Sequence, residues 1–217
     1  MKKIVSILVG SLFFASSALA GGMVGVKVGN GDLEATKKAI TNTPAALTEA
    51  AETNSVDSTF GAIFVESDAL GNTPLSLGLE VTPLTGTISA STKDHQDSSV
   101  EVSNLKTIYA LISKEVPNGS GSIYGKVGYS HADIENAKNN VPTTTINSFS
   151  DALEGTMFGV GFQSPENASG VIFRAEATLS QFDDVQVKTT DADGLVETKK
   201  AHDIELKTFT ISIAKKF

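Results

Sequence analysis

The last nine residues of the chain read Phe209-Thr210-Ile211-Ser212-Ile213-Ala214-Lys215-Lys216-Phe217. The odd positions are apolar apart from one lysine, whereas the even positions are small or polar. This period of two predicts a β-strand with one apolar and one polar face. In a soluble sandwich the apolar face would pack on a core, and in a membrane barrel it would face lipid. The rest of the chain has to decide between these environments.

The opposite end of the chain has the pattern of a secretory signal peptide. Lys2 and Lys3 precede an apolar stretch over residues 4–15, and Ala18-Leu19-Ala20 forms a cleavage site of small residues. A retained membrane anchor is the alternative, but the apolar stretch is too short to span a bilayer. We therefore expect residues 1–20 to be removed and residues 21–217 to form one exported domain.

Composition excludes several classes of protein for the exported domain. Without Lys2 and Lys3 it carries 15 basic and 25 acidic residues, so its net charge is 15 − 25 = −10. Such an acidic protein would repel nucleic-acid phosphates. The chain has no cysteine, which excludes disulfides and a cysteine-linked lipid anchor. No later apolar run approaches the ~20 residues of a spanning helix, so a membrane form of this domain would be a barrel.

Eight segments have the pattern or composition of strands. In the second and fourth, both faces are partly apolar, so their inward faces are not assigned. Long polar connections over 30–57, 85–99, 131–152 and 183–201 alternate with short turns at 67–74, 117–121 and 164–170. The segment 30–57 could hold a short helix but is interpreted as an exposed loop. The strand segments are 23–29, 58–66, 75–83, 100–114, 122–130, 153–162, 171–182 and 202–217.

Strict alternation of long and short connections is typical of outer-membrane barrels and has no cause in a soluble sandwich. The sequence therefore predicts an all-β fold, an eight-stranded antiparallel up-and-down transmembrane β-barrel. Short turns would lie in the periplasm and long loops outside the cell. The apolar face of the last strand would then meet lipid.

The signal peptide, the eight amphipathic segments and the terminal Phe217 resemble the small outer-membrane β-barrels of Gram-negative bacteria, of the OmpA-like transmembrane-domain or opacity-protein type. The segments 123–130 and 155–162 look like the glycine- and aromatic-rich hairpin strands of that family, and Phe173-Arg174-Ala175-Glu176 looks like its penultimate strand. The resemblance implies that Phe217 is an assembly signal, read by the machinery that inserts barrels. Lys215 departs from the pattern, because the family usually has an apolar or aromatic residue there.

Charged residues on the expected inner faces are the candidate site. An eight-stranded barrel is filled by its own side chains, so inner charges should pair with one another. One interpretation is a plug of ion pairs. The alternative is a gated pore for ions or small solutes, in which Arg174 exchanges between Glu176 and Glu80. The candidates are Lys27, Glu80, Lys126, Arg174 and Glu176.

Catalytic, metal and cofactor sites are not indicated. Lipid A deacylase barrels place a serine and a histidine two residues apart, a spacing absent here, because Ser130 and His131 are adjacent and point to opposite faces. We interpret His95, His131 and His202 as solvated loop residues. A lipid-modifying enzyme remains the least favoured alternative.

The expected protein is thus a monomeric, non-enzymatic barrel of the cell outer membrane with a structural or surface-interaction role. Its partners would be outer-membrane lipid, the barrel-assembly machinery and an external ligand bound by the loops.

Overall fold

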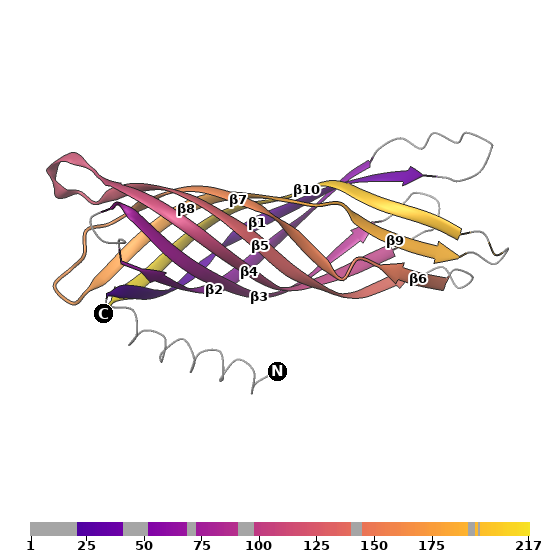
Figure 1. Cartoon of the computed structure of the whole chain (residues 1–217), viewed down its shortest axis with the longest axis horizontal. Coiled ribbons are helices and arrows are strands. Elements are labelled where there is room, and N and C mark those ends of the chain that lie inside the picture. Colours follow the sequence, from indigo (N-terminus) through magenta and orange to yellow (C-terminus); the bar gives the residue numbers. More distant parts are fainter. Residues whose placement is uncertain are drawn as a thin grey trace, which may run out of the picture.

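The computed structural model describes residues 21–40, 52–68, 73–90, 98–139, 145–190, 194 and 196–217. The expected signal peptide lies outside these ranges. Strands make up nearly all of the described chain, and none of its helices is long and apolar enough to cross a membrane. Figure 1 shows the arrangement of the strands. They are β1 (Gly22–Ile40), β2 (Glu52–Ser67), β3 (Leu75–Ala90), β4 (Ser98–Glu115), β5 (Ser122–Asn139), β6 (Thr145–Phe149), β7 (Ala152–Gln163), β8 (Val171–Phe182), β9 (Val185–Thr190) and β10 (Val196–Lys216).

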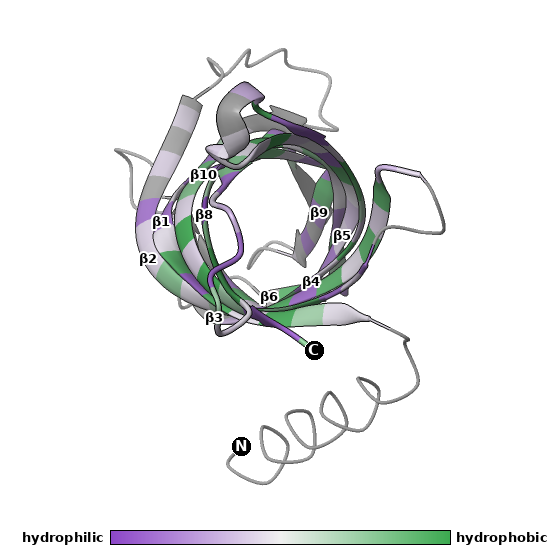
Figure 2. Cartoon of the chain, turned by 90° about the vertical axis from the view of Figure 1, so that its left-hand side faces the viewer, coloured by the Kyte–Doolittle hydropathy of each residue, from purple (hydrophilic) through white to green (hydrophobic). Residues whose placement is uncertain are grey.

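Eight of these strands close into an antiparallel barrel in the order β1-β2-β3-β4-β5-β7-β8-β10, and β10 returns to pair with β1. Figure 2 shows the ring in a view along the barrel. The two short strands prolong the wall beyond the ring, because β9 pairs with the first part of β10 and β6 pairs with β9. The predicted fold class is confirmed.

The strands are longer than the sequence predicts. The prediction of a loop or a short helix over 30–57 is wrong for its described parts, because β1 runs on to Ile40 and β2 begins at Glu52. The other predicted loops are shortened by strands in the same way. The added lengths are largely polar, and their few inward apolar residues, such as Ala35, Ala132 and Ile134, give only a weak hydropathy signal. The hydrogen-bonded ladder with neighbouring strands nevertheless continues through them.

A belt of apolar side chains surrounds the barrel on its outer face. We call this set the belt, and it confirms the lipid-facing alternation predicted for the last strand. A soluble protein would not expose such a contiguous surface, whereas a membrane barrel requires it. The belt consists of Val26, Val28, Leu77, Leu79, Ile108, Ile112, Ile123, Val127, Tyr129, Phe158, Val160, Phe162, Phe173, Phe209, Ile211, Ile213 and Phe217.

The two ends of the barrel differ. One end carries the short turns β2–β3, β4–β5 and β7–β8 together with the ends of β1 and β10, and we call it the turn end (Figure 1). The β4–β5 turn contains a short 3-10 helix, Pro117–Gly119. At the other end, the loop end, lie the far ends of β1 to β5, with β6 and β9.

The interior changes character along the barrel. Its turn-end half contains charged and aromatic side chains, described below. Toward the loop end follows a zone of hydroxyl groups, in which Thr107 pairs with Ser130 at 2.8 Å and Thr178 with Thr208 at 2.6 Å. Beyond it lies an apolar cluster of buried side chains, Ala35, Ala132, Ile134, Leu153, Phe182, Val185 and Ile204. The barrel is thus filled rather than hollow.

Candidate functional site

All five candidate residues lie on the inner face of the barrel wall. Lys27 is on β1, Glu80 on β3 and Lys126 on β5, while Arg174 and Glu176 are two residues apart on β8. The side chain of Glu80 is 13% exposed, and those of the other four are buried. In each strand these residues alternate in sequence with the belt residues. They therefore point inward where the belt residues point outward, because successive side chains of a strand point to opposite faces.

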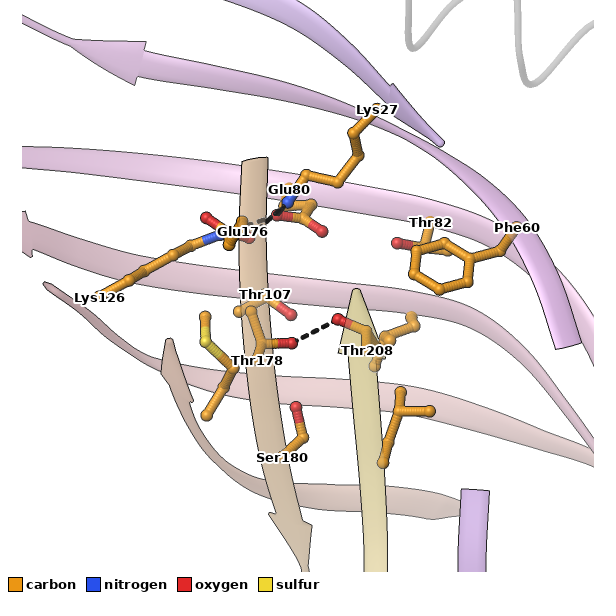
Figure 3. Close-up of a pocket in the computed structure, with 13 residues that line it drawn as sticks. Lys27, Phe60, Glu80, Thr82, Thr107, Lys126, Glu176, Thr178, Ser180 and Thr208 are labelled. Carbon is orange, nitrogen blue, oxygen red and sulfur yellow. Dashed lines mark hydrogen bonds and ion pairs between the residues drawn. The ribbon is translucent and has the colours of Figure 1, made fainter. Parts of the chain in front are cut away.

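Four of the candidates form one ionic cluster, which we call the quartet (Figure 3). The Lys27 ammonium lies 2.7 Å from a carboxylate oxygen of Glu80 and 2.8 Å from one of Glu176. The Lys126 ammonium reaches the same two oxygens at 3.0 and 3.2 Å. The second oxygen of Glu176 accepts a hydrogen bond from the Tyr124 hydroxyl at 3.1 Å. Two cations and two anions therefore neutralise one another in the middle of the lumen.

Arg174 belongs to a second ionic group, nearer the turn end. Its two terminal nitrogens donate to the two carboxylate oxygens of Glu66, each at 2.8 Å, and its Nε donates to Gln163 at 2.7 Å. The Tyr109 hydroxyl donates to Glu66 at 3.1 Å. The pore alternative pairs Arg174 with Glu176 and Glu80, whereas in the structure Arg174 pairs with Glu66. A guanidinium fork binds best to both oxygens of one carboxylate, and Glu66 offers both.

Sequence reasoning missed Glu66 because the alternation of the second strand was ambiguous. In the structure Phe60, Ala62, Phe64 and Glu66 share the inner face of β2 and are buried. The signal was present, since these residues occupy alternate positions. It was masked because Ile63 and Val65 make the opposite face apolar as well, so the pattern does not show which face points inward. In the structure the Phe64 ring lies inside, 5.5 Å from the Arg174 guanidinium carbon.

The lumen charges are balanced as a set. Lys27, Lys126 and Arg174 supply three positive charges, and Glu66, Glu80 and Glu176 supply three negative ones. Every one of these six ions has an oppositely charged partner within 3.2 Å. Desolvated charges are tolerated when they are paired and hydrogen-bonded in this way.

A small chamber lies on the loop side of the quartet. Its volume is about 30 Å³, enough for about two water molecules. Glu80 and the two lysines form one wall, and Phe60, Leu105 and Leu206 contribute apolar surface. Figure 3 shows the hydroxyl groups of Thr82, Thr107, Thr178, Ser180 and Thr208 around it. The chamber has both polar and apolar walls and is too small to be a continuous pore.

The histidines do not form a catalytic group in the described residues. His131 lies on β5 and contacts Glu154 at 3.0 Å and Asp133 at 3.4 Å, and His202 lies on β10 and contacts Asp184 at 2.7 Å. Both are therefore strand residues, not the loop residues expected. His95 lies outside the described ranges. In the part of the chain that is described, no three His, Asp or Glu side chains are grouped so as to hold a metal ion.

Phe217 lies at the turn end, where β1 and β10 meet. Its backbone N–H donates to the Gly22 carbonyl at 3.0 Å, so the terminal residue takes part in barrel closure. The side chain is exposed at the end of the belt. Its role as an assembly signal stays a prediction.

The sequence matches no protein-family model and no curated protein sequence. Similar solved structures are the outer membrane protein OprG from Pseudomonas aeruginosa (TM-score 0.67, 11% identity, covering 90% of this chain and 96% of that one) and outer membrane protein W from E. coli (0.54, 12%, 90% and 98%). Neisserial surface protein A is also similar (0.50, 10%, 89% and 97%). At these identities the likeness shows a shared fold, and it extends over nearly the whole length of each chain.

Proposed function

We propose that this chain, a small β-barrel of the outer membrane, is a closed barrel with a structural or surface-interaction role and no enzymatic activity. The observation that carries this proposal is the pairing of all six lumen charges in two layers, the quartet and the Glu66–Arg174 group. A conducting path would have to cross both layers. Breaking a buried ion pair costs about 3–5 kcal/mol, so neither layer opens readily.

The interior beyond the quartet supports the same proposal. The apolar cluster around Phe182 and Ile204 fills the barrel toward the loop end. Water and ions are excluded from such packing because it offers them no hydrogen-bonding partner. An eight-stranded barrel has an interior just wide enough for its own side chains, so little space is left beside them.

The expected partners of the protein are inferred from three of its surfaces, which are the belt, the C-terminal strand and the loop end. The belt would contact outer-membrane lipid, and the C-terminal strand with Phe217 would be read by the barrel-assembly machinery. The loop end would face outward and bind an external ligand, and the barrel would act as a monomer. These assignments are proposals supported by the apolar belt and by the position of Phe217 at the turn end.

A narrow pore for ions or small solutes is the second candidate, favoured by the chamber beside Glu80. This carboxylate is the most exposed member of the quartet, and the chamber gives it room for water on the loop side. Such a pore would conduct only when the quartet and the Glu66–Arg174 pair rearrange together.

Planar-bilayer recordings separate the two candidates. We expect the wild-type protein to show no sustained conductance steps. A variant with Lys27→Ala, Glu80→Ala, Lys126→Ala and Glu176→Ala, combined with Glu66→Ala and Arg174→Ala and with Phe182→Ala and Ile204→Ala, should conduct because both ionic layers and the centre of the apolar cluster are gone. The matched control, Glu34→Ala with Lys207→Ala, removes an ion pair of the outer surface and should stay silent. Sustained steps from the wild type would contradict the closed barrel and support the pore.

A further inference from the structure

The barrel wall has a seam between β2 and β3. The ladder between these strands contains only four pairs, Ile63↔Val81, Phe64↔Glu80, Val65↔Leu79 and Glu66↔Gly78. On its other side β2 pairs with β1 from Ser67 all the way to Glu52, and β3 pairs with β4 from Leu75 to Ala90. Toward the loop end, β2 and β3 therefore each continue with a partner on one side only within the described residues.

The seam opens where the belt ends. Leu79 is a belt residue, whereas Lys106, the β4 partner of Val81, is an exposed lysine just beyond the belt. Pro83 and a register shift between Thr82 and Thr85 follow at once on β3. Proline has no N–H to donate, and a bulge turns the strand away from its neighbour. The wall is thus continuous in lipid, where unpaired backbone is costly, and open outside it.

Beyond Pro83 the edge of β3 lacks, in the part of the chain that the structure describes, the usual protection against pairing. Residues 84–90 read Leu-Thr-Gly-Thr-Ile-Ser-Ala, with no charge and no further proline. Exposed strand edges normally carry lysine, proline or a covering segment, because their free N–H and C=O groups bind other strands. Figure 1 shows the far end of the β1–β2 pair standing apart from the end of β3, so neither strand covers the other there. We call residues 84–90 the β3 edge.

The net charge of the protein is concentrated at the same end. Counted over the described ranges, the lumen holds three charges of each sign, and so does the turn end, where Lys114, Lys215 and Lys216 balance Asp68, Glu115 and Glu166. The remaining described charges lie toward the loop end and comprise 14 acidic and eight basic residues, a balance of 8 − 14 = −6. This end of the barrel therefore attracts cations and repels a second copy of itself.

We propose that the β3 edge accepts an extended, basic segment of a partner protein as an added strand. The inference rests on the proposed surface-interaction role and names the partner chemistry for it. The free edge supplies alternating N–H and C=O groups, which only another polypeptide backbone can match along its whole length. The acidic loop end selects a basic segment and disfavours pairing between two copies of this chain.

The test uses the full barrel refolded in lipid nanodiscs and a synthetic peptide that alternates valine with lysine. Two further versions of the peptide are N-methylated, one on the odd and one on the even residues. A strand that pairs along one edge uses the N–H groups of every second residue. One methylated version should therefore bind at least about tenfold more weakly, since it loses several backbone hydrogen bonds, and the other should bind like the parent.

Hydrogen exchange locates the bound peptide, and we expect protection of the amides in residues 84–90. Ile88→Lys should weaken binding, because a lysine on the edge repels a basic strand. The matched control Ile146→Lys, on β6 at the other margin of the sheet, should leave binding unchanged. Both variants must keep the β-sheet circular dichroism and the heat-modifiable gel mobility of the folded barrel.

Several outcomes would overturn the inference. They are the absence of saturable binding, equal effects of the two methylated peptides, protection away from the β3 edge, or equal effects of the two lysine variants. Protection of the β3 edge in the absence of peptide, with a concentration-dependent dimer, would show that a second copy occupies it. None of these results bears on conductance, so failure here is distinguishable from failure of the closed-barrel proposal.

Discussion

Arg174 and Glu66 illustrate how a barrel interior stabilises charge. Both side chains are almost fully buried, and the guanidinium satisfies both carboxylate oxygens while Gln163 and Tyr109 complete the hydrogen bonding. Pairs of this kind contribute little net stability compared with apolar residues of equal size. Removal of one partner, however, leaves an uncompensated buried charge.

We therefore predict that Arg174→Ala destabilises the barrel by about 3–5 kcal/mol, because Glu66 loses its partner inside the wall. Urea unfolding in lipid vesicles measures the change. Adding Glu66→Gln to Arg174→Ala should restore much of the loss, since the buried negative charge is then gone.

An ion pair at the turn end provides the control. The Lys216 ammonium lies 3.5 Å from Asp68 and 3.6 Å from Glu166 and is partly exposed. Lys216→Ala should cost only about 0–1 kcal/mol, because solvent screens such pairs. Equal losses for Arg174→Ala and Lys216→Ala would mean that the Glu66–Arg174 pair is not desolvated.

At the scale of elements, neighbouring strands are fitted together by glycine–aromatic pairs on the inner face. Gly25 lies opposite Phe64, Gly78 opposite Tyr109, and Gly161 opposite Tyr124. In each pair the aromatic ring occupies the space where a Cβ on the glycine would lie. The rings can lie flat over the neighbouring strand only because the glycines have no side chain, so these glycines are needed for packing.

We predict that Gly161→Ala costs about 1–3 kcal/mol, because its methyl group would overlap the Tyr124 ring and displace the hydroxyl from Glu176. Gly125 is the matched control, since it faces outward and a Cβ there meets nothing within 4 Å. Gly125→Ala should change the free energy of unfolding by less than about 0.5 kcal/mol. A similar cost for both variants would argue against the packing role of the ring.

The last strand gives a second prediction at this scale. Phe217→Ala should lower the fraction of assembled barrel in cells severalfold, while folding of the purified protein into lipid changes little. Phe209→Ala is the control, because Phe209 is another exposed phenylalanine on the outer face of β10. Heat-modifiable gel mobility measures assembly. If deletion of Phe217 left assembly in cells unchanged, the assembly signal would lie elsewhere.

The molecule as a whole is polarised between its two ends. The turn end and the lumen are electrically balanced, and the loop end is acidic. The long strands carry this acidic end well beyond the belt, because β10 has 21 residues and a tilted membrane strand needs only about 9–11.

The orientation of the barrel is testable because the chain has no cysteine. Gln186→Cys, on β9 at the loop end, should react on intact cells with a membrane-impermeant maleimide. Ser120→Cys, in the β4–β5 turn, should react only after the outer membrane is permeabilised. Both positions are exposed, so their reactivity differs only through the side of the membrane they face. The reverse labelling pattern would invert the orientation.

The sequence by itself determined the eight strands, the face that meets lipid in all but the second and fourth of them, and the set of five inner charges it named. Alternation with a period of two is a local property, and lipid makes one of its two faces apolar wherever the strand lies in the membrane. Beyond the belt this constraint ends, so the sequence pattern predicts a loop where β1 and β2 in fact extend as largely polar strands.

Only the tertiary structure decided which charges pair, and it added Glu66 to their number. Glu66 and Arg174 are separated by 108 positions in the chain, and they meet because the closed ring and its register bring β2 and β8 to the same level of the lumen. The seam between β2 and β3 could likewise not be predicted from the sequence, because the number of paired residues depends on where the two backbones separate in space. The alternation in the sequence indicates whether a side chain points into the barrel or out of it, but its contacts depend on which strands the closed barrel brings together.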